Sequence, residues 1–215
     1  MPFGYPVFLE LAGRTALVIG EEAVRAGKVE GLLEAGCDRI LVVATGPAAR
    51  LDAWEASEAR VRVRRRGFEP EDLDGAFLVV ASSGDEAERA TIAREARRRG
   101  VLVNVMDDVP NCDWAAPSVV RRGDLVLAIS TGGRSPALAK RLRVELDERF
   151  GPEWDEVVAA LGAVREDVNG SIPSLRERSR RWTRALDLEE AAALVRDGRR
   201  DELERRLRRR LSEEA

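Results

Sequence analysis

The chain contains no histidine, and this absence excludes several kinds of active site at once. A Ser-His-Asp triad, a Cys-His pair and a zinc site with histidine ligands cannot form. Acid–base chemistry near neutral pH must therefore depend on carboxylates, on Lys28 or Lys140, on Tyr5 or on bound water.

Cysteine and lysine are nearly as scarce. Cys37 and Cys112 are the only cysteines and lack a metal-binding spacing, so we expect no disulfide framework and a buried Cys37. With only two lysines, the chain takes nearly all its positive charge from arginine. Arginine binds planar carboxylates through two parallel hydrogen bonds, although codon bias explains the same imbalance equally well.

Long apolar runs are missing too. No stretch approaches the roughly 20 apolar residues that span a bilayer. Met1–Tyr5 lacks the basic region and the long apolar core of a signal peptide. We therefore expect a cytoplasmic protein without membrane contact, and the net charge of −3 gives no reason to expect nucleic acid. Hydrophobic residues make up 44% of the 215-residue chain, which is sufficient for a folded core.

Short apolar segments alternate with amphipathic ones through the first half of the chain. The predicted strands are Thr15–Ile19, Arg39–Ala44, Arg60–Arg64 as a half-exposed edge strand, Phe77–Ala81 and Val101–Met106. The predicted helices are Ala23–Ala35, which ends at Gly36, and Glu86–Arg99, which ends at Gly100. This alternation is typical of βαβ units, so we expect an α/β protein with a Rossmann-like parallel sheet.

The pattern changes after Pro117. Two short strands are predicted within Ser118–Ser130, around a turn at Arg122-Gly123-Asp124. Ser135 as N-cap and Pro136 at the first helical position predict a helix that continues to Arg149. From Glu153 to Glu214 we expect amphipathic helices, divided near residues 169–173 and near Gly198.

Ligands of parallel α/β sheets bind beyond the carboxyl ends of the strands. The loop after the first strand, Gly20–Arg25, has only the first of the three glycines that a dinucleotide-binding loop contains. Glu21 and Glu22 add negative charge where a diphosphate would lie, although acidic residues are also common partners of a helix dipole. The residues expected at a dinucleotide are Gly20, Glu21, Glu22, Ala23, Val24, Thr45, Ser82 and Ser83.

Asp107 and Asp108 follow a predicted strand directly, and they are the natural general-base candidates in a protein without histidine. Successive side chains point in opposite directions, so we expect only one of them to face a cleft. The alternative is that both carboxylates cap or solvate a loop.

The segment Ser130–Pro136 places a Gly-Gly turn with flanking hydroxyl groups at the start of a helix, which suits an anion. Arg134, Lys140, Arg141 and Arg143 supply positive charge around it. A plain strand-to-helix turn with a capping serine is the alternative.

Several segments occur here in the order found in a known family: Tyr5–Leu11 with Gly13-Arg14, Asn104–Asp108, Cys112–Trp114, Pro117, Arg121–Leu125 and Ala128–Arg143. Together they resemble the siroheme synthase family, precorrin-2 dehydrogenase/sirohydrochlorin ferrochelatase, over essentially the whole chain. The run Ser130–Pro136 is the most specific part of this resemblance.

The resemblance implies an oxidation of precorrin-2 to sirohydrochlorin with NAD as cofactor. In some members the insertion of ferrous iron, a lyase reaction, follows in the same cleft. It implies a Rossmann-like domain over 1–115, a dimerisation segment over 116–150 that exchanges between the subunits of a homodimer, and a C-terminal helical domain over 151–215. Asp107 falls on the catalytic aspartate. The arginine cluster then pairs with the carboxylates of precorrin-2, and the residues expected to bind this substrate are Asp108, Ser130, Thr131, Gly132, Gly133, Arg134, Ser135 and Lys140.

The departures from the family pattern lie in the segments that are expected to bind the cofactor. Family members usually have three glycines where this chain has Gly20-Glu21-Glu22, and they usually have Arg-Lys where it has Gly27-Lys28. After the third buried strand they usually have Ala-Thr-Asp and a later asparagine, whereas this chain has Ser82-Ser83-Gly84 and Arg89. The alternative to the dehydrogenase is thus a non-redox relative, either a chelatase alone or a tetrapyrrole-binding protein. A dimeric structural or regulatory module that binds no tetrapyrrole is the third hypothesis.

Overall fold

The computed structural model describes residues 4–45, 49–168 and 174–212 of the chain. The chain divides into two units, Met1–Ala116 and Pro117–Ala215.

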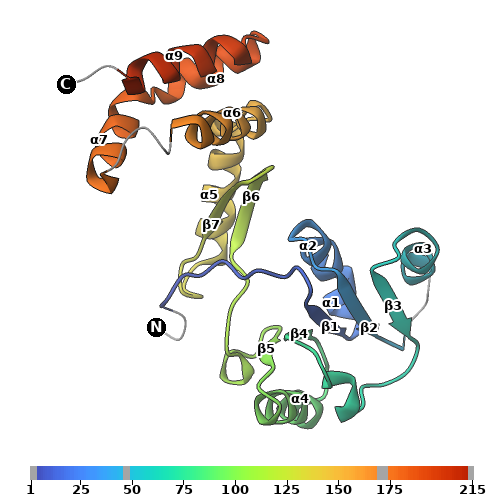
Figure 1. Ribbon diagram of the computed structural model, residues 1–215. Helices are drawn as coiled ribbons and strands as arrows, with labels where there is room; N and C mark the ends of the chain where they lie inside the picture. The colour runs from blue at the N-terminus through green and yellow to red at the C-terminus, as the bar shows by residue number, and fades with distance from the viewer. Residues whose placement is uncertain (1–3, 46–48, 169–173, 213–215) are drawn as a thin grey trace. The chain divides into compact units, whose positions relative to one another are not determined.

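A five-stranded parallel sheet in the order β3-β2-β1-β4-β5 forms the centre of the first unit (Figure 1). The strands are β1 (Thr15–Ile19), β2 (Arg39–Val43), β3 (Val61–Arg64), β4 (Leu78–Ala81) and β5 (Leu102–Val105). Leu17 in the central strand pairs with Leu41 on β2 and with Val79 on β4. The order confirms the predicted Rossmann-like sheet with β3 at an edge. From the centre of the sheet, the chain runs outward through β1, β2 and β3 on one side and through β4 and β5 on the other. Sheets of this kind bind ligands at the point between β1 and β4 where the strand order changes direction.

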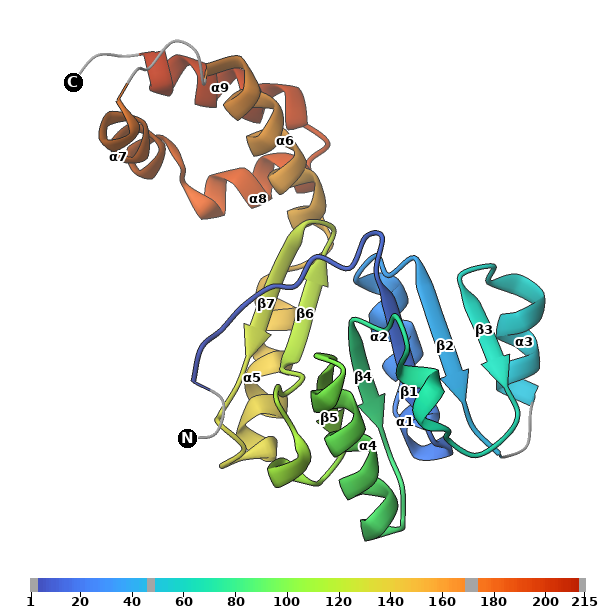
Figure 2. The ribbon, with the colours of Figure 1, turned by 60° about the horizontal axis from the view of Figure 1, so that its bottom comes forward.

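Helices cover both faces of this sheet (Figure 2). On one face lie α1 (Glu21–Arg25), α2 (Lys28–Glu34) and α3 (Ala49–Ser57); on the other lie α4 (Glu86–Arg98) and the 3₁₀ turn η1 (Pro70–Leu73). Side chains of β1 alternate between the faces, so Val18 packs with the first group while Leu17 and Ile19 pack with the second. Cys37 is fully buried on the first face, as predicted.

The predicted single helix over Ala23–Ala35 is wrong. The chain forms α1 and α2 instead, separated at Gly27, whose φ of +72° lies in the left-handed region. Val24 and Val29 on either side of the break are both buried. The apolar periodicity therefore continues across a point where the backbone leaves the helix, which glycine allows without a steric penalty.

The end of β3 is fixed to η1 by Asp72, a carboxylate whose side chain is fully buried. Arg66 donates to both of its oxygens at 2.7 Å, Arg64 donates as well, and the Glu69 N–H donates at 3.0 Å. Burial opposes ionisation of this carboxyl group, but the hydrogen bonds from Arg66, Glu69 and Arg64 outweigh it and lower the pKa of Asp72.

The second unit begins with an antiparallel hairpin, β6 (Ser118–Arg122) and β7 (Leu125–Ile129), as predicted. Helix α5 (Pro136–Arg149) follows, and the Ser135 hydroxyl accepts the Leu138 N–H at 3.2 Å, which confirms the predicted cap. No residue of α5 is buried, and β7 has none either.

Four helices complete this unit: α6 (Glu153–Val168), α7 (Leu175–Ala185), α8 (Leu188–Arg196) and α9 (Arg200–Ser212). Their shared core includes Trp154, Val157, Leu203 and Leu207. The predicted division near Gly198 is confirmed, and the one at 169–173 lies outside the described residues. A further division was not predicted: Asp187 caps α8 by accepting the N–H groups of Glu189 and Glu190, each at 3.0 Å.

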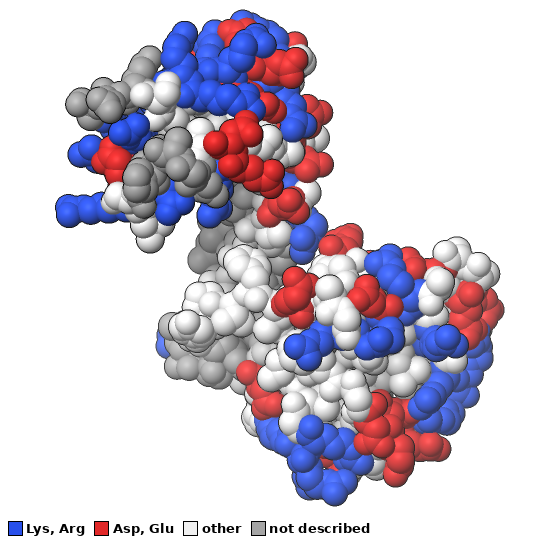
Figure 3. Space-filling model, in the orientation of Figure 1, with Lys and Arg blue, Asp and Glu red and all other residues white. Residues whose placement is uncertain are grey.

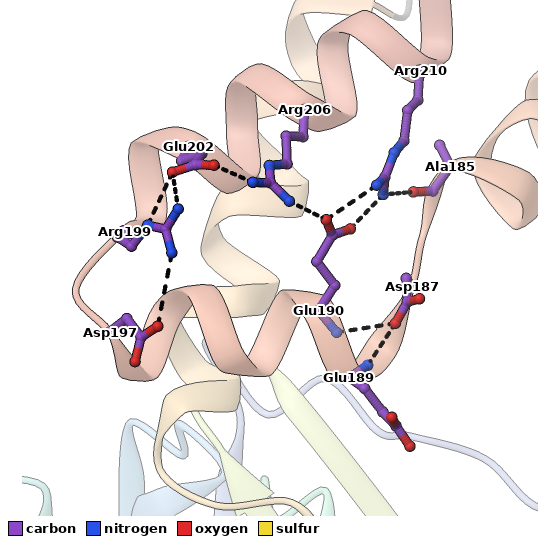
Figure 4. A network of polar contacts seen from close by, with 9 residues as sticks. All are labelled: Ala185, Asp187, Glu189, Glu190, Asp197, Arg199, Glu202, Arg206 and Arg210. Atoms are coloured by element: carbon purple, nitrogen blue, oxygen red, sulfur yellow. Dashed lines mark hydrogen bonds and ion pairs between the residues drawn. The ribbon is translucent and has the colours of Figure 1, made fainter.

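Glu190 joins α8 to α9 (Figure 4). Its carboxylate accepts from Arg210 at 2.6 and 3.1 Å and from Arg206, while Arg210 also donates to the Ala185 carbonyl at 3.0 Å. These hydrogen bonds, that from Arg210 first, lower the pKa of Glu190. Basic and acidic side chains are interleaved over the surface of these helices (Figure 3), consistent with ion pairing within the unit.

Candidate functional site

Gly20 makes the turn at the carboxyl end of β1. Its φ is +88°, and a Cβ atom at this position would lie 2.1 Å from the carbonyl oxygen of Ser82. Only glycine fits such an approach. The loop after β1 therefore lies directly against the loop after β4, at the point where the strand order reverses.

The Ser82 hydroxyl group holds these two loops together. It accepts the N–H of Ala23 at 2.9 Å and donates to the carbonyl of Ile19 at 3.3 Å. Ala23 and Val24 are buried. Two of the predicted cofactor-binding residues, Ala23 and Val24, thus lie inside the loop, and the half-buried Ser82 holds it in place.

Glu21 and Glu22 begin α1, and within the described residues their backbone N–H groups have no acceptor. Such N–H groups at a helix start carry partial positive charge. The exposed carboxylate of Glu22 pairs with Arg25 at 3.2 Å. Part of the negative charge that disfavours a diphosphate is therefore balanced within the same helix.

Thr45 and Ser83 differ in their surroundings. Thr45, after β2, is exposed. The hydroxyl group of Ser83 accepts the Asp85 N–H at 3.0 Å and donates to Glu88, and its carbonyl accepts from Arg89 at 2.9 Å. Ser83 is thereby committed to the start of α4, whereas Thr45 remains open to a ligand.

Asp107 has an unusual backbone. Its φ is +59°, and in the described parts of the chain no other residue except glycine has a positive φ. Its side chain is exposed beyond the end of β5. A left-handed backbone at a residue with a Cβ atom costs free energy, although aspartate adopts it more readily than most residues, and such residues cluster at functional sites.

Asp108 lies half-buried and makes internal contacts. Its carboxylate accepts from Arg89 Nε at 2.9 Å and from Asn111 Nδ2 at 3.0 Å. The hydrogen bonds from Asn111 and Arg89 lower the pKa of this carboxyl group. The two carboxylates therefore differ: Asp107 is exposed, and Asp108 is bound by Arg89 and Asn111. Whether Asp107 faces a ligand stays a prediction. Nothing in the sequence marks Arg89 or Asn111 as the partners of Asp108.

The second group of predicted residues belongs to the second unit. Gly132 and Gly133 have φ values of +60° and +76°, so the turn after β7 requires both glycines. Thr131 Oγ1 donates to the Ser135 carbonyl at 3.1 Å and accepts the Ser135 N–H at 3.2 Å. The Ser130 hydroxyl accepts the Gly132 N–H at 3.1 Å. These bonds shape the turn, and Arg134 and Lys140 lie exposed beside it.

The cavity at the opposite edge of the sheet and the acidic side chains of the chain give less support for a functional site. A cavity of about 480 Å³ opens at the amino ends of β1 and β4, the opposite edge from Gly20 and Asp107. Arg39 and Arg99, which line it, bind Gly13, Thr15, Asp74 and Glu95.

Across the ranges that the structure describes, no three histidine, cysteine or acidic side chains lie close enough together to hold a metal ion. Nor is any helix there long and apolar enough to cross a membrane.

The strand order and the Gly20 turn define a nucleotide-binding domain of the Rossmann type. A family model described as "Putative NAD(P)-binding" matches residues 7–118, and one described as "Sirohaem biosynthesis protein central" matches residues 122–149. The chain belongs to the siroheme synthase family.

Relatives with this name include siroheme synthase of Methylococcus capsulatus, 34% identical over 200 residues, which are 93% of this chain and 42% of the relative. Siroheme synthase 1 of Yersinia enterocolitica is 36% identical over 181 residues, 84% of this chain and 38% of the relative. The chain therefore spans about two fifths of the length of these relatives. The solved structure of SirC, a precorrin-2 dehydrogenase, is similar with a TM-score of 0.72 and 28% identity, over 96% of this chain and 100% of SirC.

Proposed function

We propose that this protein oxidises precorrin-2 to sirohydrochlorin, with a nicotinamide dinucleotide as the electron acceptor. The observation that carries the proposal is the exposed Asp107, held with a left-handed backbone at the carboxyl edge of a Rossmann-type sheet. The likeness to SirC, which extends over all of that chain, supports the same reaction class.

The residues at this edge fit a dinucleotide. Gly20 leaves room for close approach, the N–H groups of Glu21 and Glu22 are free within the described chain, and Thr45 is exposed at the end of β2. These residues would hold the cofactor. The doubt that Glu21 and Glu22 raise about NAD is reduced by the ion pair between Glu22 and Arg25.

The oxidation removes two hydrogens from the substrate, one as a hydride and one as a proton. When bound, the nicotinamide supplies the hydride acceptor. Asp107 takes the proton, because it is an exposed carboxylate at this edge and the chain has no histidine for the task. Asp108 is less suited to this role, since its carboxylate is engaged by Arg89 and Asn111.

The carboxylates of precorrin-2 would bind in part to the turn Ser130–Ser135, where Arg134 and Lys140 are exposed. Arginine and lysine side chains attract carboxylates, whereas the N–H groups of Gly132, Arg134 and Ser135 are already bound within the turn. Thr131 and Ser135 contribute by fixing the turn rather than through free hydroxyl groups.

A homodimer formed through residues 116–150 is part of the proposal. Helix α5 buries no residue, and Leu138 and Val144 on it are 50% and 38% exposed. A groove of about 440 Å³ that includes Val144 and Lys140 runs along the same helix. Apolar side chains left open on a helix favour association with a second copy. The cytoplasm stays the predicted location.

The experiment is an anaerobic incubation of the purified protein with precorrin-2 and either NAD or NADP, followed through the visible absorbance of sirohydrochlorin. We expect product that requires the dinucleotide and is lost in Asp107→Ala. Arg97→Ala serves as the control, because Arg97 lies on the outer part of α4 and is 44% exposed. Precorrin-2 binding without oxidation would contradict the proposal and favour the non-redox alternative, with ferrous iron insertion as the next assay.

A further inference from the structure

We propose that Arg89 is a positioning residue that, through Asp108, holds the backbone of Asp107 in its left-handed conformation. The inference rests on the proposed function, in which Asp107 is catalytic. Arg89 lies in the first turn of α4 and bridges two loops: its Nε donates to Asp108 at 2.9 Å and its Nη1 donates to the Ser83 carbonyl at 2.9 Å.

The backbone is fixed on both sides of Asp107. Before it, the Met106 N–H donates to the Ala81 carbonyl at 2.8 Å and so continues the pairing of β5 with β4. After it, Asp108 is bound through its side chain by Arg89 and Asn111, and its carbonyl accepts the Asn111 N–H at 3.0 Å. Asp107 is one of the two central residues of the turn Val105–Asp108, which the Asp108 N–H closes by donating to the Val105 carbonyl at 3.2 Å.

That turn is unfavourable for a residue with a Cβ atom, so it persists only while the surrounding contacts enforce it. The pair between Arg89 and Asp108 is well placed to do so, because the two side chains are only 24% and 16% exposed. Without it, the Asp108 carboxylate keeps its hydrogen bond from Asn111 but loses its ion pair, and Asp107 adopts a negative φ more readily, which swings its carboxylate away from its present direction.

The same guanidinium group also fixes the loop after β4, which touches Gly20 through Ser82. Arg89 therefore sets the position of Asp107 relative to the loops expected at the cofactor. A displacement of about 1 Å between reacting groups lowers turnover by about 100-fold.

The first test is a stability cycle that requires no substrate. In the wild-type background, Asp107→Gly should unfold at a higher urea concentration than Asp107→Ala, because glycine accepts the positive φ. In the Arg89→Met background this difference should vanish, because the turn has relaxed. Persistence of the full Gly–Ala difference would overturn the inference, whatever reaction the protein catalyses. Asp108→Asn provides a second background if Arg89→Met does not fold.

The second test is kinetic. Arg89→Met should lower kcat by about 10- to 100-fold, with little change in the KM for the dinucleotide. Arg89→Lys should recover part of the lost kcat. The kcat of the double variant Arg89→Met/Asp108→Ala should be no lower than that of the slower single variant, because the two residues act as one unit. Equal turnover in Arg89→Met and wild type would refute the positioning role.

Arg97→Met is the matched control. Arg97 also lies on α4 and pairs with a carboxylate after β5, Asp113, at 2.9 Å, but these side chains are 44% and 30% exposed. Its replacement should leave kcat unchanged. An equal loss of turnover in both variants would attribute the effect to α4 in general and overturn the assignment to Arg89. Inactive wild-type protein with a positive stability cycle would instead reject only the proposed function.

Discussion

At the scale of single residues, Asp107 combines an unfavourable backbone conformation with the proposed catalytic role. Its φ of +59° is compatible with glycine and unfavourable for alanine, so two substitutions that both remove the carboxylate should separate stability from activity. We expect both variants to lose turnover, with Asp107→Gly more stable than Asp107→Ala by about 1 kcal/mol. Urea unfolding measures the difference, and an Asp107→Ala variant with full turnover would remove this residue from the mechanism.

Glu21 and Glu22 give a second prediction at this scale. Replacing both by glycine should tighten NAD binding by about 5- to 10-fold, equivalent to roughly 1 to 1.4 kcal/mol, because charge and side-chain bulk both leave the proposed diphosphate site. Replacing both by glutamine removes only the charge and should give part of the gain. Titration calorimetry measures the affinities. Unchanged affinity in both double variants would show that the pyrophosphate is held elsewhere.

Some residue roles could not be predicted from sequence at all. Gly20 was recognisable because a strand followed by glycine is a known turn pattern. Arg89 and Asp108 are 19 positions apart and meet only after α4 packs on the sheet. The departure at Arg89 was visible in the sequence, but its partner was not.

At the scale of elements, four strands of the parallel sheet were predictable because buried parallel strands are continuous apolar runs, and the edge strand β3 was predictable because valine and arginine alternate along it. The helix break at Gly27 was missed because Val24 and Val29 keep one apolar face across it. Helix α3 was missed because Ala49–Ser57 has little amphipathic pattern, although Leu51 is buried in the core. The predicted site residues fall on two units, and their roles stay predictions.

The contact between β3 and η1 gives the element-scale prediction. Asp72→Asn should lower the free energy of unfolding by about 2 kcal/mol near pH 7, because two arginines lose a buried carboxylate. The folded state lowers the pKa of Asp72, so its contribution is present above the unfolded value of about 4 and is lost as the pH falls through the folded value.

The difference between wild type and Asp72→Asn should therefore shrink in acid, as urea titrations at several pH values would show. Asp52→Asn is the control, since Asp52 pairs with Arg65 at the surface with 61% of its side chain exposed. We expect that change to be small. A pH-independent difference for Asp72→Asn would contradict the ion-pair explanation.

At the scale of the whole molecule, the open face of α5 predicts self-association. Leu138→Asp and Val144→Glu should each weaken a homodimer by more than about 10-fold, as measured by analytical ultracentrifugation. Leu188→Glu on α8 is the matched control, with a leucine that is 47% exposed. Equal dimer dissociation constants for all three variants would show that any interface lies elsewhere.

The pairing of β1 also bears on how the protein folds during synthesis. Ala16 in this central strand pairs in register with Leu78, so the sheet cannot close until both have left the ribosome. Contacts between such distant positions form slowly, because closing a long loop costs chain entropy before the pairing is gained. The edge that carries Gly20 and Asp107 is therefore completed only after β5 has joined the sheet, and β1 is exposed to wrong partners until then.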